Sequence, residues 1–294
     1  EEIVGEIVDE IDSPSNEFYI NNRGVLITNG ENNLKELYKH FDLNPPESES
    51  STIAGYIMEI TKKSSDYKYR IGIIYPSDGV LDYEFWNFAP SIASLHFTRT
   101  KLIEGPISLG LVEKMSEDRD IDLGAETFQP IKPDVVAYAC TSASFCLGIK
   151  GEKQLLERIE SHAKAPSTTT STAIVASCKK LKLKNVAIAA PYQEEITNKF
   201  ASFLKENKID ICKVTYLGLR EGIAMVSDDD VIELGIKAND DRAEGIIIAC
   251  TNLKTYNVIH HLEKKLNKPI ITANQATIWH AGEIIGINES FDGI

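Results

Sequence analysis

The sequence predicts an α/β fold with two pseudo-symmetric, flavodoxin-like parallel-sheet lobes and a cleft between them, preceded by a small α+β module. Alternating apolar strands and amphipathic helices after residue 69 are typical of βαβ units. The same pair of strands also occurs twice: a strand that ends near proline (69–76, 185–192) is followed by one that ends at Ala-Cys-Thr (134–141, 245–251). This internal repeat indicates two similar halves, whose ligand site should lie at the carboxyl ends of the strands.

The first part of the chain has a different pattern. Apolar runs at 18–20 and 25–27 flank Asn-Asn-Arg-Gly, which predicts a β-hairpin. Residues 32–41 have helical spacing behind an asparagine N-cap candidate, and a second apolar segment spans 52–60. We therefore expect a small α+β module over residues 1–63.

This module carries a resemblance of its own. Its acidic opening at 1–12, its hairpin, its helix and the run Thr-Ile-Ala-Gly-Tyr-Ile-Met-Glu-Ile resemble the transporter-associated domain that follows CBS pairs in haemolysin-like and magnesium-efflux proteins. The final strands of that domain are missing here, so the resemblance implies a truncated module. We expect the acidic opening to be a solvated face rather than a metal or partner site. Whether the module is a natural fusion, and what it does, stays open.

A short polar stretch at 64–69 is expected to link the module to a second domain at 70–294. Within that domain, the first lobe is predicted to span about 70–170 together with a C-terminal segment. The second lobe is predicted to span about 171–280.

Composition and charge restrict the partners. The chain has 294 residues, is 43% hydrophobic and carries a formal net charge of −13, with no cluster of basic residues that stands out. This balance argues against nucleic-acid or anionic-membrane binding. There is no apolar run of membrane-spanning length, and the opening lacks the pattern of a signal peptide. We therefore expect a cytoplasmic protein that binds a small molecule, with a homo-oligomer as one candidate assembly.

The cysteines are expected to be free thiols. Five occur, with no CxxC pair and no neighbouring histidines, so neither a disulfide framework nor a metal site is predicted. Cys146 lacks the strand-end context and is expected to be structural, and Cys178 and Cys212, each beside lysine, are expected to be packing or surface residues. Cys140 and Cys250 differ, because they occupy equivalent places in the repeat.

Both repeated cysteines are followed by good N-cap residues, Thr141-Ser142 and Thr251-Asn252. If each pair starts a helix, its backbone N–H groups would favour an anion at the cleft and would lower the pKa of the thiol. A lone cysteine at the end of a buried strand is usually a packing residue. The duplication favours a functional interpretation instead.

These motifs resemble the aspartate/glutamate racemase superfamily, and within it the branch of arylmalonate decarboxylases and maleate isomerases. The resemblance covers about residues 68–290 and rests on IGIIYPSDG, ACTSASFCLG, PSTTTSTA, VAIAAPYQEE, YLGLREGIAMV, ACTNLKT and KPIITANQATIW. It implies an enzyme without a cofactor that acts on small dicarboxylic or 2-substituted acids between two α/β lobes.

The resemblance also implies roles for single residues. Cys250 matches the cysteine that acts as proton donor or base in this branch. Cys140 falls where isomerases and racemases have a second cysteine and arylmalonate decarboxylases have glycine. The implied substrate-binding residues are Pro76 and Ser77 in the first loop, Thr141, Ser142 and Tyr192 at the carboxylate, and Thr251 through its backbone N–H.

Two departures from the family pattern leave the substrate open. The asparagines that help maleate isomerases hold both carboxylates are replaced by Ser77-Asp78-Gly79 and by residues 220–225, with Arg220 as a candidate carboxylate partner. No acidic helper near the first cysteine is apparent. His260 and His261 are expected to be solvated or packing residues further along the helix.

The leading hypothesis is a cysteine-based isomerase or racemase that acts through an enediolate or a covalent thiol adduct. One alternative is a decarboxylase of the arylmalonate type, with Cys250 as proton donor. Another is a non-catalytic, carboxylate-sensing regulatory protein. The substrate, its stereochemistry and the oligomeric state are not determined by the sequence.

Overall fold

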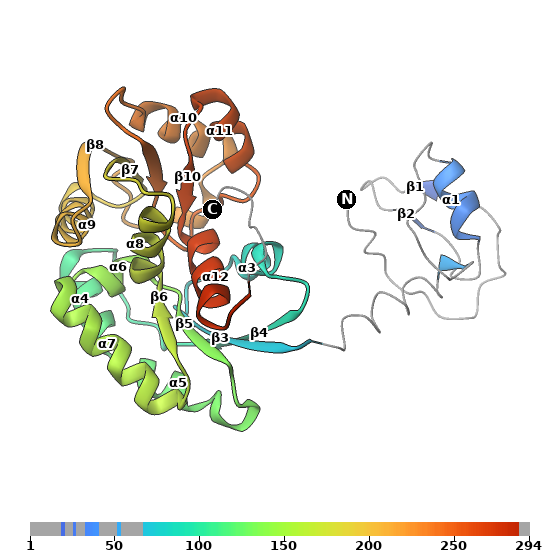
Figure 1. Ribbon diagram of the computed structural model, residues 1–294, viewed down its shortest axis with the longest axis horizontal. Helices are drawn as coiled ribbons and strands as arrows, with labels where there is room; N and C mark the ends of the chain where they lie inside the picture. Colours follow the sequence, from blue (N-terminus) through green and yellow to red (C-terminus); the bar gives the residue numbers. More distant parts are fainter. Residues whose placement is uncertain (1–18, 21–25, 28–32, 41–51, 54–66, 288–294) are drawn as a thin grey trace. The chain divides into compact units, whose positions relative to one another are not determined.

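The computed structural model describes residues 19–20, 26–27, 33–40, 52–53 and 67–287 (Figure 1). The chain divides into two compact units, 1–67 and 68–294.

In the first unit, the predicted hairpin pairing and helix are present. Strand β1 (Tyr19–Ile20) pairs antiparallel with β2 (Leu26–Ile27), and helix α1 spans Leu34–His40. Asn33 is the N-cap, because its Oδ1 accepts the backbone N–H groups of Lys35 at 2.9 Å and Glu36 at 3.2 Å. The acidic opening and most of the predicted segment at 52–60 lie outside the described residues.

The second unit contains two four-stranded parallel sheets, and each defines a lobe. The first lobe has the strand order β4-β3-β5-β6 and the second has β8-β7-β9-β10. The strands are β3 (Tyr69–Tyr75), β4 (Ala93–Arg99), β5 (Val135–Tyr138), β6 (Ser167–Thr169), β7 (Asn185–Ala190), β8 (Asp210–Tyr216), β9 (Gly245–Ile248) and β10 (Ile270–Thr272). Because the two orders are equivalent, the predicted duplication of an α/β unit is confirmed.

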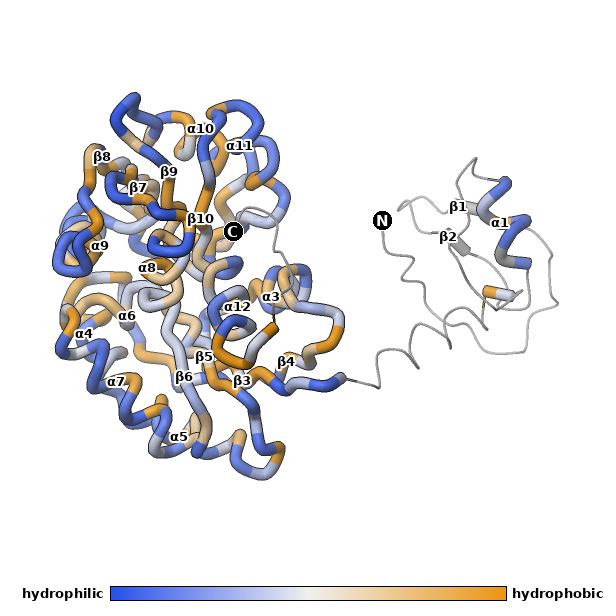
Figure 2. The backbone as a smooth tube through the Cα atoms, viewed as in Figure 1, coloured by the Kyte–Doolittle hydropathy of each residue, from blue (hydrophilic) through white to orange (hydrophobic). Residues whose placement is uncertain are grey.

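Helices cover both sheets and lie largely on the outside of the unit, where Figure 2 shows their hydrophilic faces around hydrophobic strands. They are α3 (Asp82–Phe88), α4 (Leu109–Glu117), α5 (Asp120–Glu126), α6 (Thr141–Phe145), α7 (Gly148–Ala163), α8 (Thr170–Lys180), α9 (Glu194–Glu206), α10 (Asp228–Ala238), α11 (Ile259–Leu266) and α12 (Ala273–Ile284). Short 3-10 turns occur at Gln129–Ile131 and Ile223–Met225. In the part of the chain that the structure describes, no helix combines the length and the apolar character needed to span a bilayer.

The two lobes exchange their last helices. Helix α8 follows the first sheet, yet its Ile174 and Cys178 belong to the hydrophobic core of the second lobe. Helix α12 follows the second sheet, yet its Ile278 and Ala281 join the core of the first lobe. The hydroxyls of Thr170 and Thr277 lie 2.9 Å apart and connect the two helices, which meet in the middle of the unit (Figure 1). This exchange holds the carboxyl ends of the two sheets together.

Candidate active site

Cys140 and Cys250 follow the middle strands of the two lobes. Strand β5 ends at Tyr138 and β9 ends at Ile248, so each cysteine is two residues past its strand. Both are buried, with 5% and 7% of the residue exposed, and Cys140 lies near enough to raise the pKa of the Cys250 thiol by its charge. The structure therefore brings the two repeated thiols to one place at the boundary between the lobes.

The chain leaves the two cysteines differently. Cys140 has an extended backbone (φ −141°) and is the N-cap of α6. Cys250 has φ 95°, a left-handed conformation that is unfavourable for a residue with a Cβ atom. Turns follow it, and α11 begins only at Ile259. The predicted helix start at Thr251-Asn252 is thus wrong, because the left-handed cysteine turns the chain out of the helical direction.

The expected lowering of the thiol pKa values is also wrong. Burial raises the pKa of Cys140 to about 11, although Ala143 N–H and the Ser142 hydroxyl act in the opposite direction. Burial raises the pKa of Cys250 to about 12 against the hydrogen bonds from Tyr192 and from Asn252 N–H, the latter 3.4 Å from Sγ. Loss of hydration exceeds the effect of these donors. Both groups are therefore protonated thiols at neutral pH.

Tyr192 connects the two cysteines. It follows β7 and is 2% exposed, and its hydroxyl hydrogen-bonds to Cys250 and lies near Cys140 and Thr141. Burial and the two thiols raise the Tyr192 pKa well above its ordinary value, so the hydroxyl stays neutral and can donate. The next residue, Gln193, accepts from Arg220 Nε at 2.8 Å when its amide oxygen faces the guanidinium. Arg220 therefore already has a hydrogen-bond partner in the residue that follows Tyr192.

The threonines that follow the two cysteines have different surroundings. The Thr141 hydroxyl is buried without a hydrogen bond of ordinary geometry, while its carbonyl accepts from Ser144 Oγ at 2.9 Å and Ser171 Oγ at 3.1 Å. The Thr251 hydroxyl instead donates to the carbonyl of Ala139 at 3.1 Å, across the lobe boundary. A ligand can therefore use the Thr141 hydroxyl, whereas the Thr251 hydroxyl already has a structural role.

The predicted first loop lies against the segment after Cys250. Pro76 is buried and Ser77 is exposed, and the turn closes with Gly79 N–H on the Pro76 carbonyl at 3.0 Å. Asn252 holds this loop against the segment that follows Cys250. Its Nδ2 donates to the Asp78 carbonyl at 3.0 Å, and its Oδ1 accepts from Val80 N–H at 3.3 Å. The side chain of Ser77 makes no hydrogen bond within the described residues, so its role at the substrate stays a prediction.

Several residues of the site were not predicted. Tyr75 ends the first strand and donates its hydroxyl to the Thr251 carbonyl at 2.8 Å. The repeat held no signal for it, because Pro76 corresponds to Pro191 and Tyr75 therefore corresponds to Ala190 in the second lobe. Asp78 stands where the family pattern has an asparagine region, and its charge raises the pKa of both thiols.

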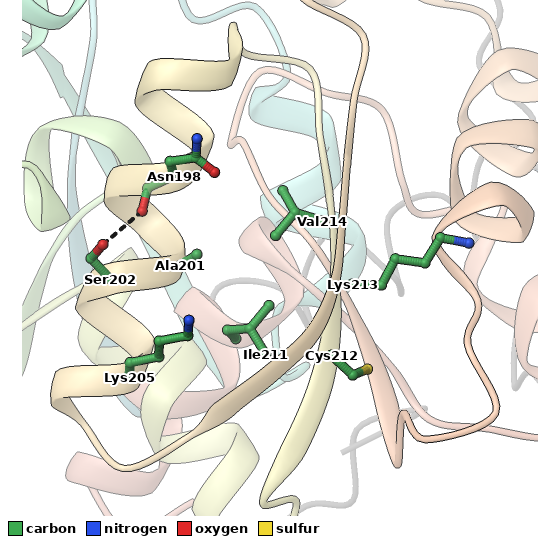
Figure 3. A pocket seen from close by; sticks show the side chains of 8 residues that line it. All are labelled: Asn198, Ala201, Ser202, Lys205, Ile211, Cys212, Lys213 and Val214. Carbon is green, nitrogen blue, oxygen red and sulfur yellow. Dashed lines mark hydrogen bonds between the residues drawn. The ribbon is translucent and has the colours of Figure 1, made fainter.

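The remaining cysteines lie in the core or at the surface. Cys146 is 2% exposed and its Sγ lies 2.7 Å from Ser116 Oγ, and Cys178 is inside α8. Cys212 lines a surface groove of about 330 Å³ between α9 and β8, which contains none of the predicted site residues (Figure 3). His260 and His261 are exposed on α11, as predicted. Across the described ranges, no group of three or more His, Cys, Asp or Glu side chains could hold a metal ion.

Two parallel-sheet lobes with one strand-end thiol each, and a neutral tyrosine between the thiols, define a cysteine-based α/β enzyme. The family model described as arylmalonate decarboxylase matches residues 116–294, which is more than half of the sequence, and the chain belongs to this family. Its named relatives are isomerases and a carbon–carbon lyase, and the protein is an enzyme of one of these two classes.

Relatives in both classes are similar along much of the chain. Maleate isomerase of Pseudomonas putida is 25% identical over 224 residues, which cover 72% of this chain and 89% of the relative. Arylmalonate decarboxylase of Bordetella bronchiseptica is 28% identical over 156 residues, which cover 52% of this chain and 65% of the relative. A crystal structure of a maleate isomerase from Pseudomonas putida superposes with a TM-score of 0.71 at 21% identity, covering 76% of this chain and 96% of that one. At this level of identity, the superposition shows that the two proteins share a fold.

Proposed function

We propose that the protein is an isomerase or racemase of a small carboxylic acid, with Cys140 and Cys250 as its two reacting groups. The observation that carries the proposal is the pair of buried thiols at equivalent strand ends, with Tyr192 beside both of them. A second thiol is not needed to deliver one proton to carbon. It is needed when a proton must leave one face of the substrate and arrive on the other.

In a racemisation, one cysteine acts as thiolate and removes the α-proton, so that the C–H electrons form an enediolate. The other cysteine, as a thiol, then gives its proton to the opposite face of the α-carbon. One thiolate is consumed and one is produced, and a second turnover in the opposite direction restores the first state. Because burial keeps both groups protonated at neutral pH, one of them must lose its proton as the substrate binds.

In a cis–trans isomerisation, the thiolate would instead add to one carbon of the double bond and form a C–S bond, while the π bond breaks and its electron pair moves to the other carbon and its carboxylate as an enediolate. Rotation about the resulting single bond and expulsion of the thiolate would give the trans acid. A solved structure of maleate cis-trans isomerase from Nocardia farcinica contains a covalently bound succinylcysteine intermediate. That protein has the same fold, with a TM-score of 0.67, which supports this route as one to test here.

The substrate carboxylate is proposed to lie against neutral donors. The Thr141 hydroxyl is buried near the Tyr192 hydroxyl, Ser142 is close to Cys140, and the Tyr192 hydroxyl stays protonated. Thr251 N–H, which has no backbone acceptor within the described ranges, completes the set. Such fixed donors stabilise the charge that builds on carboxyl oxygens, and each can contribute about 3 kcal/mol. Pro76 and Ser77, in the first loop, would form one wall of the substrate site.

A decarboxylase is the second candidate, because the matching family model bears that name. Loss of CO₂ from a malonate leaves the same enediolate, and Cys250 alone could protonate it. The carboxylate-sensing alternative is set aside, because the chain belongs to an enzyme family.

The test is incubation of the full chain in D₂O with separate panels of 2-substituted acids, unsaturated diacids and malonates. We expect deuterium at the α-carbon with inversion, or cis–trans conversion, and we expect Cys140→Gly to abolish either reaction. CO₂ release that survives Cys140→Gly would replace the proposal with the decarboxylase. Absence of any exchange or isomerisation in the panels would refute it.

We also propose that the protein acts in the cytoplasm on a small carboxylate, without nucleic acid, with a homo-oligomer as one candidate assembly. Cell fractionation and sedimentation measure these two properties. The boundary at 64–69 remains a prediction, which limited proteolysis would test by cleavage there.

A further inference from the structure

Glu84 is a buried carboxylate that forms no ion pair with the described residues. It lies in α3 of the first lobe and is 1% exposed. Its Oε1 accepts the backbone N–H groups of Thr255 and Tyr256, the latter at 3.0 Å. Its Oε2 accepts from the Thr255 hydroxyl at 3.2 Å and from Asn274 Nδ2 at 2.8 Å. All four donors belong to the segment that follows Cys250 or to the start of α12.

Asn274 extends this contact toward the active site. The same Nδ2 that donates to Glu84 also donates to the Thr251 carbonyl at 3.1 Å, while the Asn274 Oδ1 has no hydrogen-bond partner. A carboxylate can only accept, so Glu84 sets which end of this amide faces it. Glu84 therefore also determines that a donor reaches the carbonyl of Thr251, the residue after Cys250.

The carbonyl that receives this donor belongs to Thr251, the residue that directly follows a strained backbone position. Cys250 has φ 95°, which a residue with a Cβ atom adopts only when its surroundings hold it there. The Thr251 carbonyl accepts both Asn274 Nδ2 and the Tyr75 hydroxyl, so two contacts from distant parts of the chain hold the strained turn. Such strain at a reacting group is typical of sites whose geometry is set by the rest of the fold.

We propose that Glu84 is a positioning residue that, through Asn274, holds Cys250 in its left-handed conformation at the boundary between the lobes. The inference rests on the proposed function insofar as Cys250 is one of the two reacting groups. Glu84 touches neither thiol in the hydrogen-bond network, so its effect on the reaction is indirect.

A second buried glutamate provides a matched control. Glu152 in α7 is 8% exposed and accepts from the hydroxyls of Thr169, at 2.8 Å, and Thr172. Its partners belong to the first lobe and to the start of α8, away from the segment that follows Cys250. Burial raises the pKa of both glutamates, so Glu84→Gln and Glu152→Gln make comparable chemical changes.

The test is the rate of alkylation of each cysteine by iodoacetamide in the full chain, measured by mass spectrometry as a function of pH. In Glu84→Gln, the new amide group would face the amide donor of Asn274, and Asn274 must turn and release the Thr251 carbonyl. Burial is the largest cause of the raised pKa of Cys250, so a released loop should lower that pKa from about 12. Each unit of decrease increases the thiolate fraction about tenfold.

We expect Cys250 to react about tenfold faster or more in Glu84→Gln, with its pH profile shifted to lower pH. Cys140 should stay within about twofold of the wild type, because the groups that hydrogen-bond its thiol, Ala143 N–H, Ser142 and Tyr138, lie outside the Glu84 network. In Glu152→Gln the Cys250 rate should be unchanged. Turnover of whichever substrate the D₂O panels identify should fall in Glu84→Gln through kcat rather than KM, although the thiol has become more reactive.

A variant that leaves Glu84 in place keeps the test usable if Glu84→Gln folds poorly. Asn274→Ala removes the donor to the Thr251 carbonyl and leaves the two backbone donors on Glu84, and it should give the same change at Cys250. The proposal would be overturned by equal acceleration of both thiols, which indicates general loosening, or by an unchanged Cys250. Because alkylation needs no substrate, a failure of the proposed function would appear separately, as absence of turnover in the wild type.

Discussion

Glycine is usually less stable than alanine inside a folded protein, but the backbone of Cys250 predicts the opposite order at this position. Replacing Cys250 by alanine keeps a Cβ atom at φ 95°, whereas replacing it by glycine removes the strain. A non-glycine residue held in a rarely populated region costs about 1–3 kcal/mol. The greater flexibility of glycine in the unfolded chain costs about 0.5–1 kcal/mol. We therefore expect Cys250→Gly to be more stable than Cys250→Ala by about 1 kcal/mol.

Cys178 is the matched control, because it is fully buried but lies inside helix α8. There glycine should be less stable than alanine by about 1 kcal/mol. For a domain of this size, 1 kcal/mol corresponds to about 2–4 °C in Tm. Thermal and urea unfolding of the four variants of the full chain measure both differences. If Cys250→Ala equals or exceeds Cys250→Gly in stability, the turn is not strained and the reasoning fails.

Three further predictions concern the contacts around the thiols. Tyr192→Phe removes a donor that lowers the pKa of Cys250, so the alkylation midpoint should rise and turnover should fall about 10²–10³-fold; an unchanged turnover would exclude Tyr192 from the site. Asp78→Asn removes a negative charge that raises the pKa of both thiols, so both alkylation profiles should move to lower pH, and a shift of only one would place Asp78 away from the other. Gly79→Ala would set a Cβ atom 2.4 Å from the Tyr75 ring, so it should displace that ring and lower both Tm and kcat; a variant with wild-type Tm and kcat would contradict the close approach.

The same thiols also predict how stability depends on pH above neutrality. Both folded-state pKa values, about 11 and about 12, are higher than the ordinary value of 9.0. The folded state therefore binds more protons than the unfolded chain between these values, and stability should fall as pH rises from about 9 to about 12. In Cys250→Ala this decrease should be smaller. Urea unfolding at pH 8 and pH 10 compares the two proteins, and an equal decrease in both would show that Cys250 is not protonated in the folded state.

Much of the architecture could be predicted because apolar runs and local capping contacts are visible in the sequence itself. The buried strands at 71–75 and 245–248 are short apolar runs, and Asn33 caps α1 through a local contact with Lys35 and Glu36. The two Ala-Cys-Thr phrases identified equivalent strand ends, and the equivalent order of strands in the two sheets agrees with that duplication.

The identical phrases nevertheless hid an asymmetry. Thr141 begins a helix, whereas Thr251 enters a turn, although both follow Ala-Cys at the end of a buried strand. The difference arises from partners far away in the chain, since Tyr75 and Asn274 bind the Thr251 carbonyl. The shared Ala-Cys-Thr phrase cannot indicate such a difference, because it is the same in both places.

The sequence by itself determined that this protein has a duplicated α/β unit with two equivalent strand-end thiols. Apolar periodicity and the repeat are properties of neighbouring residues, and they are sufficient for that conclusion. Only the tertiary structure decided the state and geometry of the thiols. Burial raised their pKa values instead of lowering them, and contacts from α3 and α12 hold Cys250 in a left-handed turn. Desolvation and long-range hydrogen bonds depend on which segments meet in space, and that information exists only once the chain has folded.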